Sequence, residues 1–325
     1  MNDSPAKHSN ILKLFQKHPQ LGTLIGLIII VIIFSIASPF FLTPLNIFSL
    51  INQTASIVIV AFGMTMILLT GNIDLSVGGV LALVGVVSAL LLMAGVPLPL
   101  IIIIGLLIGS FVGLLNGLIV TFFGIQPFLV TMGMMTITRG LAQYATGGRS
   151  LFITADGFRQ VTSQGYLFGI PVLVYWVALF ALVTYFLVSH TPFGRRMQAV
   201  GGNTEAASYS GINVKKVQII VFVMSGFLAA VAGFITMSRL STAMPTVALG
   251  IEMDAIAAAV LGGTGFKGEG GSIAGTVLGA LVIGTIINGL TVLRVDAFLQ
   301  NVIMGIIIIV AVIISVTISK KAANN

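Results

Sequence analysis

The chain has no cysteine and few charged residues. Its 325 residues include 15 Lys and Arg and 8 Asp and Glu, so 7% are charged. An ordinary soluble domain carries charge on about a quarter of its residues. The lack of cysteine excludes thiol catalysis, disulfides and thiolate metal sites, and three histidines leave little for a metal centre, so we expect neither an enzyme nor a metal site. The net charge of +7 forms no basic stripe with interleaved aromatics, so we expect no nucleic-acid partner.

Long apolar runs dominate the sequence instead. Hydrophobic residues make up 57% of the chain, the mean hydropathy is +1.15, and the runs are continuous rather than alternating. Continuous runs are typical of membrane helices, which need about 20 residues to cross a hydrocarbon core about 30 Å thick. The eighth run is short for a full crossing. The sequence predicts an all-α polytopic membrane protein with about ten spans, at 21–38, 47–69, 77–95, 98–122, 127–145, 170–188, 217–237, 252–264, 273–292 and 298–317.

Basic residues are distributed unevenly over the predicted loops, and short cytoplasmic loops hold an excess of them in membrane proteins. With the N-terminus inside, Arg149, Arg159, Arg239 and Arg294 lie outside. This uneven distribution of basic residues predicts a cytoplasmic N-terminal segment at 1–20, one transmembrane domain at 21–317 and a cytoplasmic tail at 318–325. Cleavage of the first span as a signal peptide, after the small residues Ser35 and Ala37, is the alternative. The ten cytoplasmic basic residues are Lys7, Lys13, Lys17, Arg195, Arg196, Lys215, Lys216, Lys267, Lys320 and Lys321.

Two short patterns recur five spans apart. Residues 116–118 and 288–290 both read Asn-Gly-Leu, and Phe-Leu follows each about ten residues later. An odd offset reverses direction across the bilayer, so the pattern indicates an inverted 5+5 repeat, with chance recurrence as the alternative. Glycines at intervals of four predict close helix packing inside the bundle. They are Gly105, Gly109, Gly113 and Gly117 in the fourth span and Gly275 and Gly279 in the ninth.

The longest polar stretch on the cytoplasmic side is the loop at about 190–216. Gly201 and Gly202 break structure there, Asn203 or Thr204 can cap a helix, and Gly211 ends it after about two turns. Such a helix suits docking of another protein, and a solvated connector with basic anchors is the alternative. A second glycine-rich segment, at 261–275, is not a phosphate-binding loop because its lysine follows Phe rather than Gly.

Acidic and amide side chains inside apolar segments are the remaining candidates. A carboxylate there is costly unless it is paired or wetted, so Asp74 is a functional suspect near the cytoplasmic end of the third span. It could cap that helix, line or gate a path, or relay protons. Glu252 and Asp254, at the outer end of the eighth span, could cap it or meet a partner. Amides suit a neutral polyhydroxyl solute but also join helices, and those in spans are Asn52, Gln53, Asn116, Asn288, Gln300 and Asn301.

Four long polar stretches resemble one family of membrane proteins. They are GNIDLSVGG (71–79), PFGRRMQAVGGNTEAASYSGINVKKV (192–217), SRLSTAMPT (238–246) and EMDAIAAAVLGGTGFKGEGGSIAGT (252–276). They resemble the permease subunits of ribose-type monosaccharide ABC importers, in the branched-chain amino acid and ribose permease family. The resemblance runs from about residue 40 to 317. Asn72 and the turn at 265–269 depart from the usual family pattern, which weakens inference about the exact sugar.

The resemblance implies a multi-pass permease of the bacterial plasma membrane. Its partners would be ATP-binding cassette subunits, an extracytoplasmic sugar-binding protein and a second permease copy or homologue, with no cofactor of its own. ATP hydrolysis would lie on a separate subunit, and Arg195 and Arg196 would hold the coupling loop at the interface. The segment that matches the family's coupling motif comprises Thr204, Glu205, Ala206, Ala207 and Gly211.

We therefore expect alternating access driven by a separate ATPase, for ribose or a similar pentose. Translocation or gating would involve Asn52, Asp74, Asn116, Glu252, Asp254 and Asn288. An ion-coupled secondary transporter, with Asp74, Glu252 or Asp254 as the relay, is the main alternative. An importer of a hexose, a signalling furanose or an amino acid, and a scaffold without transport, also remain open.

Overall fold

A computed structural model describes residues 19–153, 156–265, 268 and 270–323 of the chain. The predicted N-terminal segment at 1–20 therefore lies almost wholly outside the described residues, as does Lys267. Two small antiparallel strand pairs occur, β1 (Leu151–Phe152) with β4 (Thr242–Ala243) and β2 (Tyr166–Leu167) with β3 (Ile170–Pro171). The rest of the regular structure in this part is helical, which confirms the predicted class: α2 (Pro19–Ala37), α3 (Pro44–Leu69), α4 (Val77–Met93), α5 (Leu98–Phe123), α6 (Pro127–Thr146), α7 (Asp156–Arg159), the π-helical η1 (Gln160–Gln164), α8 (Val172–His190), α9 (Pro192–Gly202), α10 (Thr204–Tyr209), α11 (Val214–Leu240), α12 (Ile251–Leu261), α13 (Ile273–Val292) and α14 (Ala297–Ala323).

Each of the ten predicted spans coincides with a helix. Six of them, α2, α3, α5, α8, α11 and α13, are long and apolar enough to cross a membrane. α4 and the first part of α14 are shorter apolar helices, and α6 is 20 residues long but less apolar. α12 has 11 residues, or about 16 Å at the usual helical rise, so it covers only about half of a hydrocarbon core.

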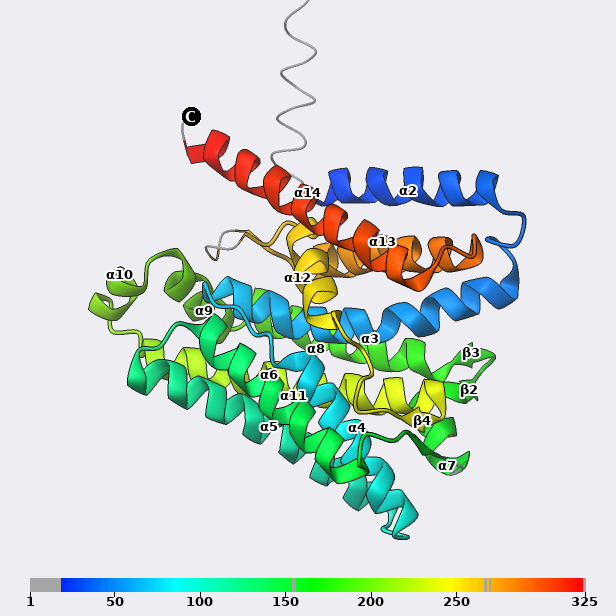
Figure 1. Ribbon diagram of the computed structural model, residues 1–325. Helices are drawn as coiled ribbons and strands as arrows, with labels where there is room; N and C mark the ends of the chain where they lie inside the picture. The colour runs from blue at the N-terminus through cyan, green and yellow to red at the C-terminus, as the bar shows by residue number, and fades with distance from the viewer. Residues whose placement is uncertain (1–18, 154–155, 266–267, 269, 324–325) are drawn as a thin grey trace, which may run out of the picture.

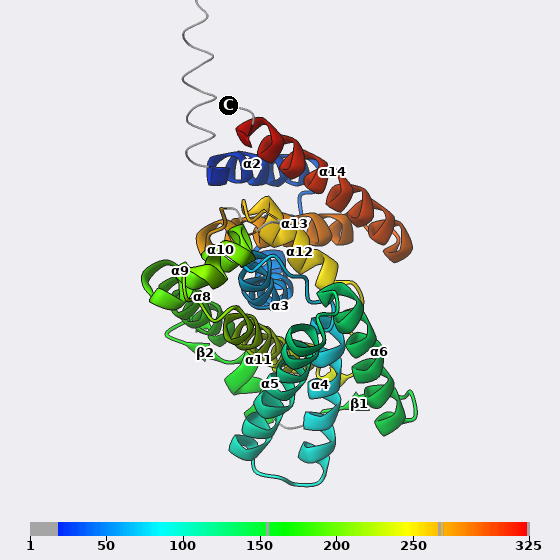
Figure 2. The ribbon, with the colours of Figure 1, turned by 90° about the vertical axis from the view of Figure 1, so that its left-hand side faces the viewer.

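α3 and α11 form the centre of the bundle (Figures 1 and 2). Every residue of α3 from Thr54 to Leu69 is buried, and α11 packs against α3, α4 and α5. A Cβ atom on Gly63 would lie 3.1 Å from the Cα of Ser225, so the two central helices touch at the backbone. α2 and α8 lie outside and expose large apolar side chains such as Ile36 and Leu182, as expected of surfaces that face lipid.

The predicted glycine stripes do permit close packing. On α5, a Cβ on Gly109 would meet the carbonyl oxygen of Gly226, and one on Gly117 would lie 2.8 Å from the Cα of Ile219, both on α11. On α13, Gly279 approaches the backbone of Ala258 in α12 in the same way, and Gly275 approaches that of Gly262, the residue directly after α12. The prediction that α5 lies inside the bundle is wrong, because the face opposite its glycines is exposed at Ile103, Leu107 and Phe111.

The two ends of the bundle differ in structure. α9 and α10 lie at one end, and α7, β2 and β3 lie at the other (Figure 1). Gln20 at the start of α2 lines a small cavity together with Gln198 of α9, so α2 begins at the α9 end. α14 ends on that same side (Figure 1).

Two segments depart from the sequence prediction. The loop at 190–216 was expected to hold one short helix, but it holds two, because residues 192–202 form α9 ahead of α10. Gly201 and Gly202, expected to break structure, are the last residues of α9. The second departure lies between α3 and α4, where residues 72–75 are non-helical and are enclosed by the bundle rather than lying at its end.

Candidate functional site

α9 lies against the α9 end of the bundle with one apolar face. Thr191 caps its N-terminus by accepting a hydrogen bond from Gly194 N at 3.2 Å, and Pro192 occupies the first turn, where a missing N–H costs nothing. Met197 and Val200 are completely buried, whereas Arg195 and Arg196 are exposed. The helix therefore presents its two arginines away from the bundle.

α10 is a short helix that stands at the surface. The Asn203 side chain caps it by accepting a hydrogen bond from Ala206 N at 2.9 Å, and Gly211 ends it with a φ of +82°. Of the predicted coupling residues, only Ala207 is buried, and it anchors the helix. Thr204, Glu205 and Ala206 are exposed. This confirms the predicted helix, with its cap at the first of the two candidate residues.

Tyr209, which we did not predict as a site residue, is 92% exposed at the end of α10. A large aromatic ring held in water on a small helix is a common feature of contact surfaces. Its position among polar residues, directly before the helix-ending Ser-Gly pair, was the sequence signal that could have identified it.

Three backbones meet behind this surface. A Cβ on Gly201, near the end of α9, would clash with the carbonyl oxygen of Leu69 at the end of α3. It would also lie 3.0 Å from the Cα of Gly268 in the glycine-rich loop between α12 and α13. Movement of α9 toward the bundle would therefore push the end of α3 or that loop, since backbone atoms in contact have no slack.

Asp74 lies in the enclosed segment between α3 and α4, and its exposure is 0%. One carboxylate oxygen accepts hydrogen bonds from the Ser76 amide (2.9 Å) and hydroxyl (2.6 Å). The other accepts from the Ser225 hydroxyl at 2.7 Å, midway along α11. Asn116 of α5 donates to the Ser76 hydroxyl at 2.8 Å. The prediction that Asp74 lies near the cytoplasmic interface is wrong, because α5 and α11 enclose it inside the bundle.

Glu252 lies in the first turn of α12 and is buried beside Arg139 of α6. Gly78 of α4 makes this possible, because a Cβ there would meet both a Glu252 carboxylate oxygen and the Arg139 guanidinium. Arg139 also donates hydrogen bonds to the carbonyl oxygens of Val247 (3.2 Å) and Ala248 (3.3 Å). The guanidinium thus ties α6 to the non-helical segment that precedes α12.

Among the predicted amides, Asn288 joins two helices of the bundle. Asn288 of α13 and Asn46 of α3 exchange two hydrogen bonds, of 2.9 and 3.0 Å. Asn52 is partly buried, and its carbonyl oxygen has no hydrogen-bond partner in the described part of the chain. Asn288 is thereby explained as a link between helices, the alternative that the sequence left open.

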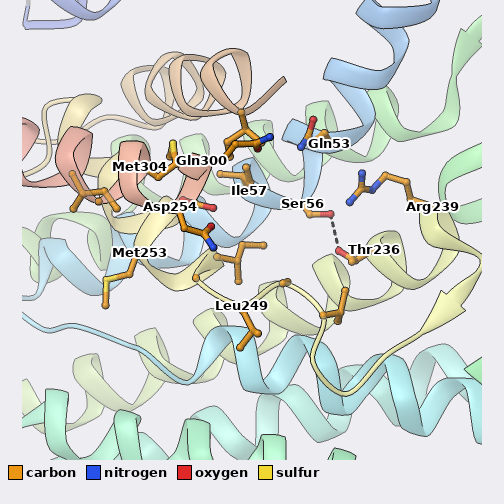
Figure 3. Close-up of a pocket in the computed structure, with 18 residues that line it drawn as sticks. Gln53, Ser56, Ile57, Thr236, Arg239, Leu249, Met253, Asp254, Gln300 and Met304 are labelled. Atoms are coloured by element: carbon orange, nitrogen blue, oxygen red, sulfur yellow. Dashed lines mark hydrogen bonds between the residues drawn. The ribbon is translucent and has the colours of Figure 1, made fainter. Parts of the chain in front are cut away.

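A cavity of about 570 Å³ lies between α3, α11, α12, α13 and α14 (Figure 3). Asp254 is the only member of the predicted translocation set that lines it. The structure therefore does not bring the six predicted residues together. Asp74 and Asn116 form one buried network, Glu252 belongs to another cluster, and Asn288 pairs with Asn46. The cavity does gather three amides and two charged groups: Gln53, Gln300, Asn301, Arg239 and Asp254.

Comparison with known proteins shows the family to which the chain belongs. A family described as "Branched-chain amino acid transport system / permease component" matches residues 46–312. The chain belongs to this permease family. The ribose import permease protein RbsC of Bacillus subtilis (strain 168) is 46% identical to the permease over 306 residues, covering 94% of each chain.

Further relatives agree with this assignment. RbsC of Escherichia coli (strain K12) is 39% identical, over 90% of the permease and 92% of that protein. The D-allose transport system permease protein AlsC of the same strain is 41% identical, over 92% of both. A solved structure of a putative metal-chelate type ABC transporter shares the fold, with a TM-score of 0.50 and 15% identity over 94% of the permease and 98% of that chain. The recognition made from the four polar stretches is confirmed.

Proposed function

We propose that the permease carries a monosaccharide, ribose or a similar pentose, across the bacterial plasma membrane in an ATP-driven importer. The observation that carries this proposal is the similarity to ribose and allose permeases along nearly the whole of each chain. Hydrolysis of ATP belongs to separate cassette subunits. An extracytoplasmic binding protein delivers the sugar, and a second permease copy or a homologue completes the path.

α9 and α10 are the surface through which the ATPase acts. The exposed residues Thr204, Glu205 and Ala206 contact it, while Ala207 and Gly211 fix the shape of α10 and Arg195 and Arg196 flank the contact. When the ATPase moves α9, the contact of Gly201 with Leu69 transmits the displacement to the end of α3. The adjoining segment carries Asp74, which is bonded to α11, so the two central helices respond together. Alternating access then follows from their relative movement.

The α9 end of the bundle is the cytoplasmic end in this proposal. α2 begins there and α14 ends there (Figure 1), so both termini are cytoplasmic. Exposed Arg195, Arg196, Lys215 and Lys216 at this end agree with the excess of basic residues in cytoplasmic loops.

Helix packing supports the inverted 5+5 repeat. α5 packs on α11, and α13, five spans later than α5, packs on α3, five spans earlier than α11. The third and eighth spans match in the same way, because α4 and α12 are both short and both follow non-helical segments. Those segments enter from opposite ends of the bundle (Figure 1), as an inverted repeat requires.

Uptake by membrane vesicles separates this proposal from ion-coupled transport. We expect an ionophore that collapses the proton gradient to leave uptake of labelled ribose unchanged when ATP is supplied, and ATP depletion to abolish it. The opposite pattern would favour the secondary transporter with Asp74, Glu252 or Asp254 as relay. Competition by allose, arabinose or leucine in the same assay identifies the substrate class. An importer whose uptake is blocked by leucine alone contradicts the sugar assignment.

A further inference from the structure

The cavity between α3, α11, α12, α13 and α14 has the features of a binding site. Its volume of about 570 Å³ lies within the range of about 300–1,000 Å³ typical of small-molecule sites. Five amide or charged side chains from four helices line it, and Gln53, Arg239, Asp254 and Gln300 converge on the same space (Figure 3). Apolar side chains such as Ile57 and Met304 form the rest of the wall.

Among the residues that the structure describes, the charged groups in this wall have no hydrogen-bond partner. The Nε atom of Arg239 is buried and has no hydrogen-bond acceptor in the part of the chain that the structure covers. Asp254, whose side chain is half-buried, receives no hydrogen bond from the described residues, and the charge that acts on it most is that of another acid, Glu252. Buried polar groups are normally hydrogen-bonded, so a guanidinium and a carboxylate that line one cavity without hydrogen-bond partners among the described residues indicate a polar occupant.

The donors and acceptors define the chemistry of that occupant. Asp254 can only accept when ionised, Arg239 can only donate, and the amides of Gln53, Gln300 and Asn301 do both. A sugar hydroxyl also does both, so a polyhydroxyl molecule can satisfy every one of these groups. The two charges have opposite sign, which gives no net attraction for an ion. The cavity wall contains no aromatic ring on which a sugar could stack, so we expect weak binding, as suits a site from which the solute must leave.

We infer that each permease chain holds its own transit site for a neutral polyhydroxyl solute in the cavity lined by Gln53, Arg239, Asp254, Gln300 and Asn301. This inference rests on the proposed function, since it concerns the solute carried. It differs from that proposal in placing a binding step within a single chain, after release from the binding protein.

Protection of an introduced cysteine tests the site directly. Because the chain has no cysteine, Met253→Cys places a single thiol in the cavity wall at a residue that is 41% exposed. The assembled transporter in nanodiscs is treated with a small water-soluble maleimide. We expect D-ribose in the millimolar range to slow labelling about threefold or more, since weak sites have millimolar Kd values. Met93→Cys, at the end of α4 and 66% exposed, is the matched control, and its labelling should not respond to ribose.

Three results of the labelling experiment would overturn the inference. They are equal labelling of Met253→Cys with and without sugar, protection by leucine rather than by sugars, and a cysteine that never reacts because the cavity is closed to water. None of them depends on whether uptake occurs, so they are distinct from failure of the proposed function, which the vesicle assay measures.

Transport stoichiometry supplies the second test. Gln53→Leu removes a polar group of the cavity. Gln218→Leu is the control: it makes the same change at a half-buried glutamine near the start of α11, whereas α11 reaches the cavity near its other end, at Arg239. We expect Gln53→Leu to lower sugar transported per ATP hydrolysed by about fivefold, the effect of losing about one hydrogen bond. ATPase stimulation by the loaded binding protein and the amount of protein in the membrane should stay at the parent level. Equal ratios in the two variants would contradict a solute site at Gln53.

Discussion

Gly211 is the single residue on which the shape of the coupling surface most clearly depends. Its φ of +82° ends α10, and an L side chain in that conformation costs roughly 1–2 kcal/mol. We predict that Gly211→Val leaves the permease in the membrane but uncouples ATP hydrolysis from uptake, because α10 must change shape to relieve the strain. Gly202→Ala, at a glycine with ordinary φ and open space around it, is the control. Normal sugar uptake by Gly211→Val would count against docking at α10.

Asp74 should act through hydrogen bonding rather than proton transfer. Asp74→Ala would leave the buried Ser76 amide and the Ser225 hydroxyl without an acceptor, at a cost of about 1–3 kcal/mol each. We predict a lower Tm for Asp74→Ala in detergent, with a smaller decrease for Ser225→Ala, which removes one of these bonds. Asp74→Asn, which keeps an acceptor, should retain most ATP-driven uptake. Loss of uptake in Asp74→Asn at an unchanged Tm would instead favour the relay.

Gly211 and Asp74 also show which features of single residues the sequence could predict and which it could not. Asn203 and Gly211 were identified correctly because capping and helix termination depend only on neighbours in the chain. The depth of Asp74 could not be predicted, because it depends on α5 and α11 closing around residues 72–75 from far away in the sequence. The cavity was missed for the same reason, since it combines side chains from several helices, although its amides had been noted.

At the scale of elements, the α5–α11 contact should tolerate no side chain on its glycine stripe. A Cβ on Gly113 would clash with the carbonyl oxygen of Phe222 and lie 2.8 Å from its carbonyl carbon. We predict that Gly113→Leu reduces the amount of folded permease, because overpacking costs typically 1–3 kcal/mol and backbone atoms cannot move aside as side chains can. Gly26→Leu on α2, with nothing within 4 Å of its Cβ position, should express normally. Equal yields of folded protein would contradict this packing.

The long apolar runs of the sequence predicted the spanning helices correctly, but they did not predict the polar helices. All ten predicted spans correspond to helices because each is a continuous apolar run. α9 was not predicted, although Phe193, Met197 and Val200 follow helical spacing and Thr191-Pro192 is a typical helix start. Two adjacent glycines outweighed that signal. Segment 156–171 was likewise missed, since its short helices and hairpin rest on contacts such as Ser163 with Ser238.

At the scale of the whole molecule, the orientation can be checked with single cysteines. Tyr209 on α10 and Phe168 in the β2–β3 hairpin are each 92% exposed, at opposite ends of the bundle (Figure 1). We predict that an impermeant thiol reagent added to intact cells labels Phe168→Cys but not Tyr209→Cys, and that permeabilisation exposes Tyr209→Cys. Labelling of Tyr209→Cys in intact cells would reverse the orientation and move the ATPase contact away from α10.

The dependence of uphill transport on the ATPase is the measurement that matters most for the whole molecule. Labelled monosaccharide accumulation would be followed in proteoliposomes that contain the permease alone, or the permease with its cassette subunits and the loaded binding protein, both with ATP. The energy for transport enters through α9 and α10, so accumulation against a gradient should appear only in the complete assembly. Uphill accumulation by the permease alone would contradict this description.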